Sequence, residues 1–154
     1  MILKKYTPQY CATLVELFYN TVHNINRKDY TQIQCNAWAT KTVDLEQWNT
    51  SFLKQYCIIA EINGIIVGFG DIDKTGYLDK LFVHHNYQHK GIASAICDEL
   101  EKAVNTKNIT VHASITAKGF FEKRNYKIIK QQQVIRNGIF LKNYVMTKTK
   151  INPL

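Results

Sequence analysis

Cysteine pairs, prolines and long apolar runs are scarce in this chain of 154 residues, and each scarcity excludes a class of protein. The four cysteines are far apart and form no CxxC pair, so we expect no zinc site and no disulfide framework. Free thiols are typical of a reducing cytosol. No apolar stretch approaches the ~20 residues that cross a bilayer. We therefore expect a soluble cytoplasmic protein without a metal.

Nothing in the sequence marks a domain boundary. The only prolines are Pro8 and Pro153, and no segment is rich in proline, glycine or serine or repeats another. A hydrophobic content of 45% is enough for a substantial core. We expect one globular domain over residues 1–154.

The charge balance favours anionic partners. Twenty Lys and Arg against 12 Asp and Glu give a formal net charge of +8. Such a surface suits nucleic acid, acidic membrane or a polyphosphorylated cofactor, and charge alone does not choose among them. The lysines are spread along the chain, without an arginine-rich run or an RNP-type motif. A nucleic-acid-binding module therefore stays the less favoured alternative, and we expect neither a nucleic-acid partner nor a membrane partner.

Helical spacing of apolar residues dominates the first third of the chain, after a short strand at residues 2–6. Thr7, followed by proline, begins a helix that reaches about Val22. Asp29 is the expected cap of a second helix. The apolar face of this second helix comprises Tyr30, Ile33, Ala37 and Trp38. A further turn of helix is expected at residues 45–53.

Strands dominate the middle of the chain. The runs YCIIAEI, IIVGFGDI and YLDKLFV are short, β-branched and aromatic, and Asn63-Gly64 joins the first two as a hairpin. IASAICDELEKAV is a helix, NITVHAS a strand and TAKGFFEKRN a short helix, and Asn137-Gly138 joins two last strands. The order β-α-α-β-β-β-α-β-α-β-β predicts an α+β (mixed α/β) domain with helices on the faces of a sheet.

One hexapeptide, QHKGIA from Gln88 to Ala93, lies between a strand and a strong helix. The first amides of a helix have no intrahelical acceptor and carry the positive end of the helix dipole, so they can bind an anion. Gly91 would let the backbone approach a phosphate closely. The alternative is a plain turn before an ordinary helix. No GxxxxGK[ST] or GxGxxG motif is present, which disfavours an NTPase or a dehydrogenase.

In this context the sequence resembles the GNAT superfamily of acetyl-CoA-dependent N-acetyltransferases. QHKGIA fits the family's Q/R-x-x-G-x-G/A signature, and SITAKGFFEKRNY looks like its N-x-x-A-x-x-(L/F)-Y-E-K-x-G-F segment. VHNINRKDYTQIQCNAWA resembles a bacterial subgroup whose acceptors are mostly unassigned. The resemblance implies a twisted, mostly antiparallel sheet of six to seven strands with about four helices. It also implies transfer of acetyl from acetyl-CoA to a primary amine of a small molecule or peptide.

The resemblance further implies how the coenzyme is held. Backbone groups of residues 81–83 would bind the pantetheine arm as one more strand, and amides of residues 88–94 would bind the pyrophosphate. Lys90 would attract the polyanion. The expected cofactor-binding residues are Leu81, Phe82, Val83, Gln88, His89, Lys90, Gly91, Ile92, Ala93, Ser94, Ser114 and Phe121.

The reaction needs a base for the ammonium and a donor for the oxyanion. Asp79 is the first candidate base, because strand alternation puts it on the face of Leu81 and Val83. Glu61 and Asp71 are the reserves. A salt bridge or strand-edge carboxylate is the alternative role of Asp79. The backbone amide of Val83 would stabilise the oxyanion, as is usual in the family.

The family pattern breaks at Phe121, where many members have a tyrosine that protonates the leaving thiolate. Thiolate can leave unaided, because a thiol pKa of about 8.5 makes sulfur a fair leaving group. Otherwise Tyr144 is the preferred acid, with Tyr126 behind it, although both also suit sheet packing. Phe121 keeps open the alternative of a CoA-binding sensor or interaction protein without transfer. Two milder departures, Ser114 for Asn and Asn125 for Gly, leave the fold expectation intact.

The acceptor pocket is expected at the first helices and the strand ends. Its candidate residues are His23, Tyr30 and Trp38, with Trp48 beside them. An aromatic wall with few carboxylates suits a small amine or an amino-acid-like acceptor. Core packing of Tyr30 and Trp38, and a helix-end cap at His23, are the alternatives. The family resemblance implies a monomer or a homodimer.

Overall fold

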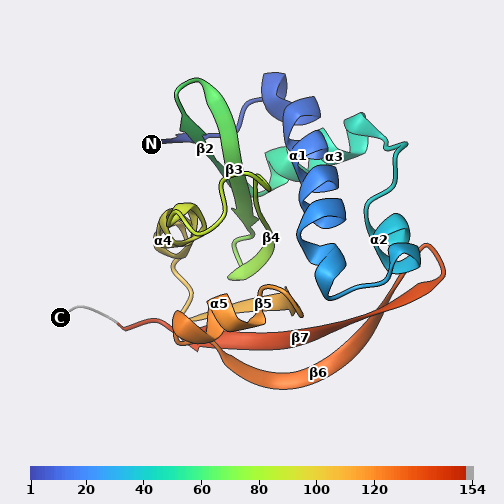
Figure 1. Cartoon of the computed structure of the whole chain (residues 1–154). Helices are drawn as coiled ribbons and strands as arrows, with labels where there is room; N and C mark the ends of the chain where they lie inside the picture. The colour runs from blue at the N-terminus through green and yellow to red at the C-terminus, as the bar shows by residue number, and fades with distance from the viewer. Residues whose placement is uncertain (152–154) are drawn as a thin grey trace.

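The computed structural model describes residues 1–151 and shows a strongly twisted sheet with helices on both faces (Figure 1). The last three residues of the domain expected over 1–154 lie outside the described range. Within that range seven strands follow the order β1-β2-β3-β4-β5-β7-β6, and every neighbouring pair is antiparallel except β4 and β5. The mostly antiparallel α+β sheet expected from the sequence is thus confirmed.

The elements have these bounds. The strands are β1 (Ile2–Lys5), β2 (Tyr56–Ile62), β3 (Ile65–Ile72), β4 (Tyr77–Val83), β5 (Asn108–Ser114), β6 (Lys127–Arg136) and β7 (Ile139–Thr149). The helices are α1 (Cys11–Asn24), α2 (Gln32–Trp38), α3 (Leu45–Lys54), α4 (Ile92–Ala103) and α5 (Lys118–Lys123), with single 3₁₀ turns at Pro8–Tyr10 and Asn26–Lys28. None of the helices within residues 1–151 is both long enough and apolar enough to span a membrane.

Two Asn-Gly turns set the register of the sheet. Asn63 and Gly64 have φ values of 50° and 79°, and Asn137 and Gly138 have 49° and 79°. Two consecutive residues with positive φ make the type I′ turn, whose twist matches that of the flanking strands. Both predicted hairpins, β2–β3 and β6–β7, are therefore confirmed.

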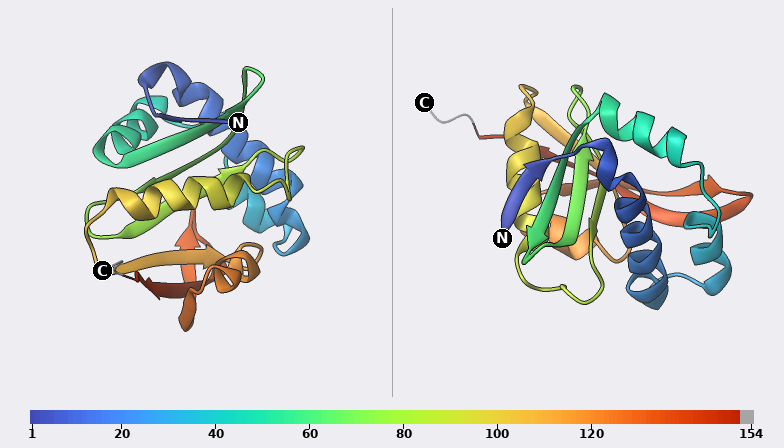
Figure 2. Two further views of the ribbon diagram at one scale, coloured as in Figure 1. Left: turned by 90° about the vertical axis from the view of Figure 1, so that its left-hand side faces the viewer. Right: turned by 90° about the horizontal axis from the view of Figure 1, so that it is seen from above.

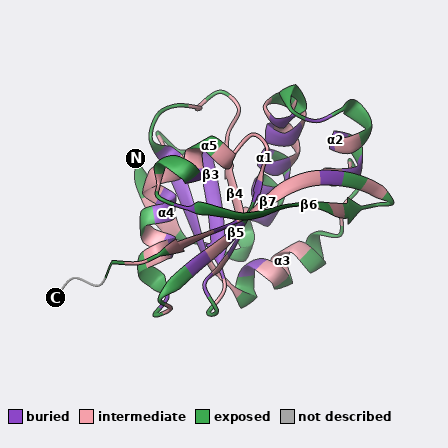
Figure 3. Cartoon of the chain, turned by 90° about the horizontal axis from the view of Figure 1, so that it is seen from below, coloured by how far each residue is buried: buried purple, intermediate pink, exposed green. Residues whose placement is uncertain are grey.

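The helices divide between the two faces of the sheet (Figure 2). On one face α1, α2 and α3 bury Leu14, Phe18 and Phe52 against Phe69 of β3. On the other face α4 and α5 bury Ile96 and other apolar side chains in a second cluster. The inner strand β3 is buried almost throughout, while β6 forms an exposed edge (Figure 3).

The start of α2 corrects the sequence prediction. Thr31, not Asp29, is the N-cap: its Oγ1 accepts a 3.1 Å hydrogen bond from the Gln34 amide, and Gln34 Oε1 accepts from the Thr31 amide at 2.9 Å. This capping box satisfies two amides at once. Asp29 instead accepts a hydrogen bond from Thr116 Oγ1. Ile33, which was expected on the apolar face of this helix, is 66% exposed, so that part of the prediction is wrong.

The carboxylate of Glu101 joins α4 to the second half of the sheet. It accepts hydrogen bonds from Arg124 Nη2 (3.0 Å), the Tyr126 hydroxyl (2.8 Å) and Lys148 Nζ (2.9 Å). Burial raises the pKa of Glu101, but these three partners outweigh burial and the net pKa is lowered. Glu101 is thus a carboxylate in the folded protein.

Candidate active site

A cavity of about 670 Å³ opens where β4 and β5 diverge. The two strands pair only at Tyr77↔Thr110 and Leu78↔Val111, and beyond these pairs they separate. We call the space between residues 81–83 of β4 and residues 113–114 of β5 the β4–β5 gap. All five of these residues line the cavity, so the expected segment 81–83 lies in it.

The backbone of β4 presents hydrogen-bonding groups to this gap. The amide of His84 donates to the carbonyl of Val67 on β3 at 2.8 Å. Backbone groups in an antiparallel strand alternate in direction, so those of Leu81 and Val83 point away from β3, toward the gap. The carbonyl of Val83 accordingly accepts hydrogen bonds from Gln88 Nε2 (2.8 Å) and Thr21 Oγ1 (2.9 Å). Gln88 therefore fixes β4 with its side chain.

The loop before α4 forms an open cradle at the helix start. His89 and Gly91 both have positive φ, 59° and 78°, and Gly91 is the N-cap of the 12-residue helix. No atom lies within 4 Å of a Cβ built on Gly91, so a ligand can approach its backbone. The side chain of Ile92 is buried, whereas Lys90 is exposed. Of the loop residues expected to bind cofactor, Gln88, His89 and Ala93 line the cavity.

Asp79 is the single carboxylate among the described residues that line the cavity, but it faces differently from the prediction. In the β3–β4 register Asp71 pairs with Lys80 and Ile72 with Leu78, which leaves Asp79 as the extra residue of a β-bulge. The bulge breaks the alternation that would align Asp79 with Leu81 and Val83. Its carboxylate instead accepts from Lys80 Nζ (2.8 Å) and Gln55 Nε2 (3.4 Å).

Lys80 links Asp79 to a buried second carboxylate. Asp71 is fully buried, and its oxygens accept from the Lys80 amide at 2.9 Å and from Lys80 Nζ at 3.3 Å. Burial raises the pKa of Asp71 to about 6. Burial alone would lower the pKa of Lys80, but the charges of Asp71 and Asp79 outweigh it and raise that pKa. The other reserve base, Glu61, is ion-paired to Lys4 and does not line the cavity.

Aromatic rings enclose the part of the cavity beside α1, α2 and α3. We call this part the aromatic chamber, which is lined by Phe18, Tyr30, Trp38, Trp48 and Phe82. The rings contact one another edge-on or tilted, with Phe18 4.9 Å from Phe82 and Trp38 5.5 Å from Tyr30 between centroids. The structure thus brings Tyr30, Trp38 and Trp48 together, as the sequence suggested.

Two of the expected acceptor residues have structural contacts. Tyr30 donates a hydrogen bond to the carbonyl of Lys142 (2.6 Å) and accepts one from the amide of Ile115 (2.9 Å). Burial raises the pKa of Tyr30 to about 12. His23 is not among the cavity-lining residues. Its Nε2 contacts the carbonyl of Ala39 (2.8 Å), and its ring lies tilted against Tyr19, with 4.2 Å between the ring centroids.

The hydroxyls considered as general acids do not reach the cavity. Tyr144 is not among its lining residues, and the ammonium of Lys118 lies 5.2 Å from its ring centroid. The hydroxyl of Tyr126 donates its hydrogen bond to Glu101. Phe121 lines the cavity but is nearly buried and has no proton to give. Ser114, also in the lining, accepts a hydrogen bond from the amide of Ala117 at 3.0 Å.

The sequence did not single out several polar residues of the cavity. Thr21 donates a hydrogen bond to the carbonyl of Val83. Asn143 has a buried Oδ1 that accepts no hydrogen bond from a donor among residues 1–151. Arg136 lines the cavity from β6. Each comes from an element far away in sequence from the β4–α4 signature. Their only sequence signal is a polar residue on the inward face of a strand or helix.

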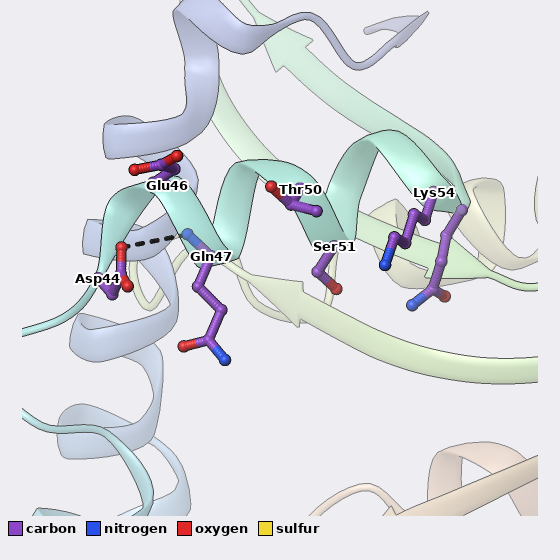
Figure 4. A pocket seen from close by; sticks show the side chains of 7 residues that line it. Asp44, Glu46, Gln47, Thr50, Ser51 and Lys54 are labelled. Carbon is purple, nitrogen blue, oxygen red and sulfur yellow. Dashed lines mark hydrogen bonds between the residues drawn. The ribbon is translucent and has the colours of Figure 1, made fainter.

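A second hollow, of about 610 Å³, follows one side of α3 (Figure 4). Its lining is polar and comes from α3 and its flanking residues alone, including the N-cap Asp44 that accepts a hydrogen bond from the Gln47 amide. Ser51 and Gln55 of this lining also contact Lys80 and Asp79. Two residues of this lining thus help to position the Asp79–Lys80 pair.

Comparisons with known proteins agree with this geometry. The family profile described as Acetyltransferase (GNAT) domain matches residues 26–148. The Uncharacterized N-acetyltransferase YafP of Escherichia coli (strain K12) is 34% identical over 145 residues, which cover 94% of this chain and 93% of that protein.

Solved structures add to the comparison. The GCN5-Related N-acetyltransferase "Aminotransferase, Class-II" from Rhodopseudomonas palustris is 30% identical, with a TM-score of 0.94 over 97% of this chain and 95% of that one. The PaiA N-acetyltransferase from Thermoplasma acidophilum, solved with coenzyme A, shares the fold at 17% identity, with a TM-score of 0.75 over 97% and 98% of the two chains.

Family membership follows from the extent of these matches. The profile spans most of the chain, and relatives of at least 30% identity cover nearly all of it. The chain belongs to the GNAT acetyltransferase family. It is therefore an enzyme, an N-acetyltransferase that uses acetyl-CoA, and the resemblance seen in the sequence is confirmed.

Proposed function

We propose that the protein transfers an acetyl group from acetyl-CoA to a primary amine of a small molecule or peptide by direct attack on the thioester. The observation that carries the proposal is the β4–β5 gap, whose inward backbone groups adjoin the open cradle at Gly91. The gap offers backbone groups to an extended chain, which suits the pantetheine arm. The cradle offers backbone amides to an anion, which suits the pyrophosphate. The cytoplasm is the proposed setting, and a monomer or homodimer the proposed working unit.

Backbone groups account for most of the proposed coenzyme binding. Leu81 and Val83 would hydrogen-bond the pantetheine amides as an added strand would. The amides from His89 to Ser94 would bind the pyrophosphate, because they are the free donors of a helix start. Lys90, Phe82, Ser114 and Phe121 would complete the site around them.

The proposed chemistry uses few side chains. A neutral amine attacks the thioester carbonyl, a carbon–nitrogen bond forms, and the carbon–sulfur bond breaks to release CoA thiolate. Asp79, directly or through water, takes the proton of the ammonium, and the Val83 amide donates to the oxyanion. Lys80 would orient Asp79 through their 2.8 Å ion pair. Thiolate leaves without a tyrosine acid, since thiols have a pKa of about 8.5.

A CoA-binding sensor without transfer is the second candidate. Phe121 favours it, because the position of the usual acid carries no hydroxyl and Tyr144 lies outside the cavity lining. The two candidates make the same prediction for coenzyme binding and differ in turnover.

One pair of measurements tests both candidates. Acetyl-CoA at about 100 µM should raise the melting temperature, because a ligand that binds only the native state stabilises it. A generic oligonucleotide is the control, and a shift with the oligonucleotide alone would support the nucleic-acid alternative. Thiol release from acetyl-CoA is then followed across a library of amines. Binding without turnover of any amine class would favour the sensor, and no binding would overturn the acetyl-CoA site.

A further inference from the structure

The cavity is cationic where an amine substrate would enter. Among the residues that the structure describes, its lining contains four Lys or Arg side chains and one carboxylate. That carboxylate, Asp79, is already ion-paired to Lys80. A site for a polycationic amine would need acidic residues that this lining does not supply.

The proposed transfer gives no role to three of these cations, Lys28, Lys142 and Arg136, and Arg136 is the only arginine among them. It is the last residue of β6, two positions after Val134 and directly opposite Ile139 of β7. Both neighbours pack against the apolar cluster beneath α1 and α2, so strand alternation places Arg136 on the same face. It lines the cavity, yet it remains exposed, which puts it at the mouth.

The guanidinium of Arg136 has no acidic partner. It forms no ion pair with any residue in the range 1–151. Its one hydrogen bond runs from Nη1 to the carbonyl of Ile135 at 3.2 Å, which leaves further donors free. The planar guanidinium fits carboxylate and phosphate groups with two parallel hydrogen bonds.

The positive charge of Arg136 acts across the mouth. Burial raises the pKa of Tyr77 to about 12, and the charge of Arg136 opposes that rise. Burial lowers the pKa of His112, which Asp79 counters and Arg136 reinforces. Tyr77 and His112 lie on β4 and β5, where the β4–β5 gap begins. Arg136 lines the same cavity as these two residues.

We propose that the acceptor is an amine that also carries an acidic group, a carboxylate or a phosphate, and that Arg136 binds this group at the mouth. The aromatic chamber would hold the carbon skeleton of the acceptor, and its amine would lie at the thioester. The inference rests on the proposed transfer. It makes Arg136 a specificity-determining residue and disfavours polyamines as acceptors.

Matched pairs of amines test the proposal. The twenty amino acids are compared with their carboxamides, and phosphoethanolamine with ethanolamine, by thiol release from acetyl-CoA. The first set of pairs tests a carboxylate and the second a phosphate. We expect at least one acid-bearing amine to exceed its neutral counterpart in kcat/KM by about tenfold or more, since a hydrogen bond to a charged group is worth that much.

Two variants assign the preference to its residue. Arg136→Gln should bring the acid-bearing amine close to its neutral counterpart without changing the Kd of acetyl-CoA. Lys127→Gln removes an equal charge from the far end of β6, outside the cavity lining, and should preserve the preference.

Several outcomes would overturn the proposal. Equal turnover within every pair would do so, as would an Arg136→Gln variant that weakens acetyl-CoA binding instead. The proposal would also be overturned if no acid-bearing amine is acetylated and none changes the melting temperature of the CoA-loaded protein. If acetyl-CoA itself fails to bind, the proposed transfer is what fails.

Discussion

Replacing Gly91 with valine tests the anion cradle, and Gly64 provides a matched control. The two glycines have φ of 78° and 79°, and neither has an atom within 4 Å of an added Cβ. Gly91 begins α4 beside the cavity, while Gly64 lies in the β2–β3 turn. The substitutions Gly91→Val and Gly64→Val therefore impose the same backbone strain, and only the first obstructs the cradle.

The magnitudes follow from this pairing. A non-glycine residue in the left-handed region costs roughly 1–2 kcal/mol. We expect each variant to lose about 2–8 °C of melting temperature, at about 2–4 °C per kcal/mol for a chain of this size. Loss of one amide–phosphate hydrogen bond, worth about 1.5–3 kcal/mol, weakens binding by about 10- to 150-fold.

Calorimetric titration with CoA measures this difference. Gly91→Val should show the weakened Kd, and Gly64→Val should bind as the wild type does. If Gly91→Val keeps the affinity of Gly64→Val, the pyrophosphate is held elsewhere and the cradle assignment is refuted.

Three further substitutions probe the carboxylates. Asp79→Asn should lower kcat/KM at pH 7 by about 100-fold, and the loss should shrink as pH rises and the amine deprotonates unaided; an unchanged pH–rate profile removes Asp79 as the base. The folded pKa of Asp71, about 6 against 3.8, is raised, so the wild type should lose up to about 3 kcal/mol of stability relative to Asp71→Asn as pH rises from 4 to 7. Parallel urea curves at both pH values would contradict this. The pKa of Glu101 is lowered in the folded protein, so its effect on stability depends on pH in the opposite direction. Glu101→Gln should lower the free energy of unfolding by about 1–3 kcal/mol at pH 7, and this difference from the wild type should disappear as pH falls below 4.5. Urea unfolding at several pH values measures this difference, and a difference that does not change with pH would show that packing of Glu101 matters more than its charge.

Local signals made much of the fold predictable. The two Asn-Gly turns need only the residues themselves and the twist of the strands they join. The buried face of α4, with Ile92, Ile96 and Leu100, follows from helical spacing, and all three are at most 2% exposed. The start of α2 was harder to predict, because Asp29 and Thr31 are both good N-cap residues and only the capping box with Gln34 decides between them.

The site was predictable where one segment builds it and unpredictable where several segments meet. The QHKGIA loop indicated the cradle because strand, turn and helix follow one another in sequence. Asp79 was misplaced on its strand because a bulge depends on the pairing partner and leaves no trace in the strand's own pattern. Arg136 and Asn143 escaped notice because only the order of the sheet brings β6 and β7 to the same cavity as β4.

Because β4 and β5 share few pairs, we expect the binding of acetyl-CoA and the binding of the acceptor amine to be coupled. The coenzyme loop belongs to the half of the sheet formed by β1–β4, whereas Arg136 belongs to the half formed by β5–β7, and two register pairs connect the halves directly. A pantetheine arm between them would act as a spacer that sets their separation. Donor and acceptor would then each tighten the binding of the other by the same factor, as thermodynamic linkage requires.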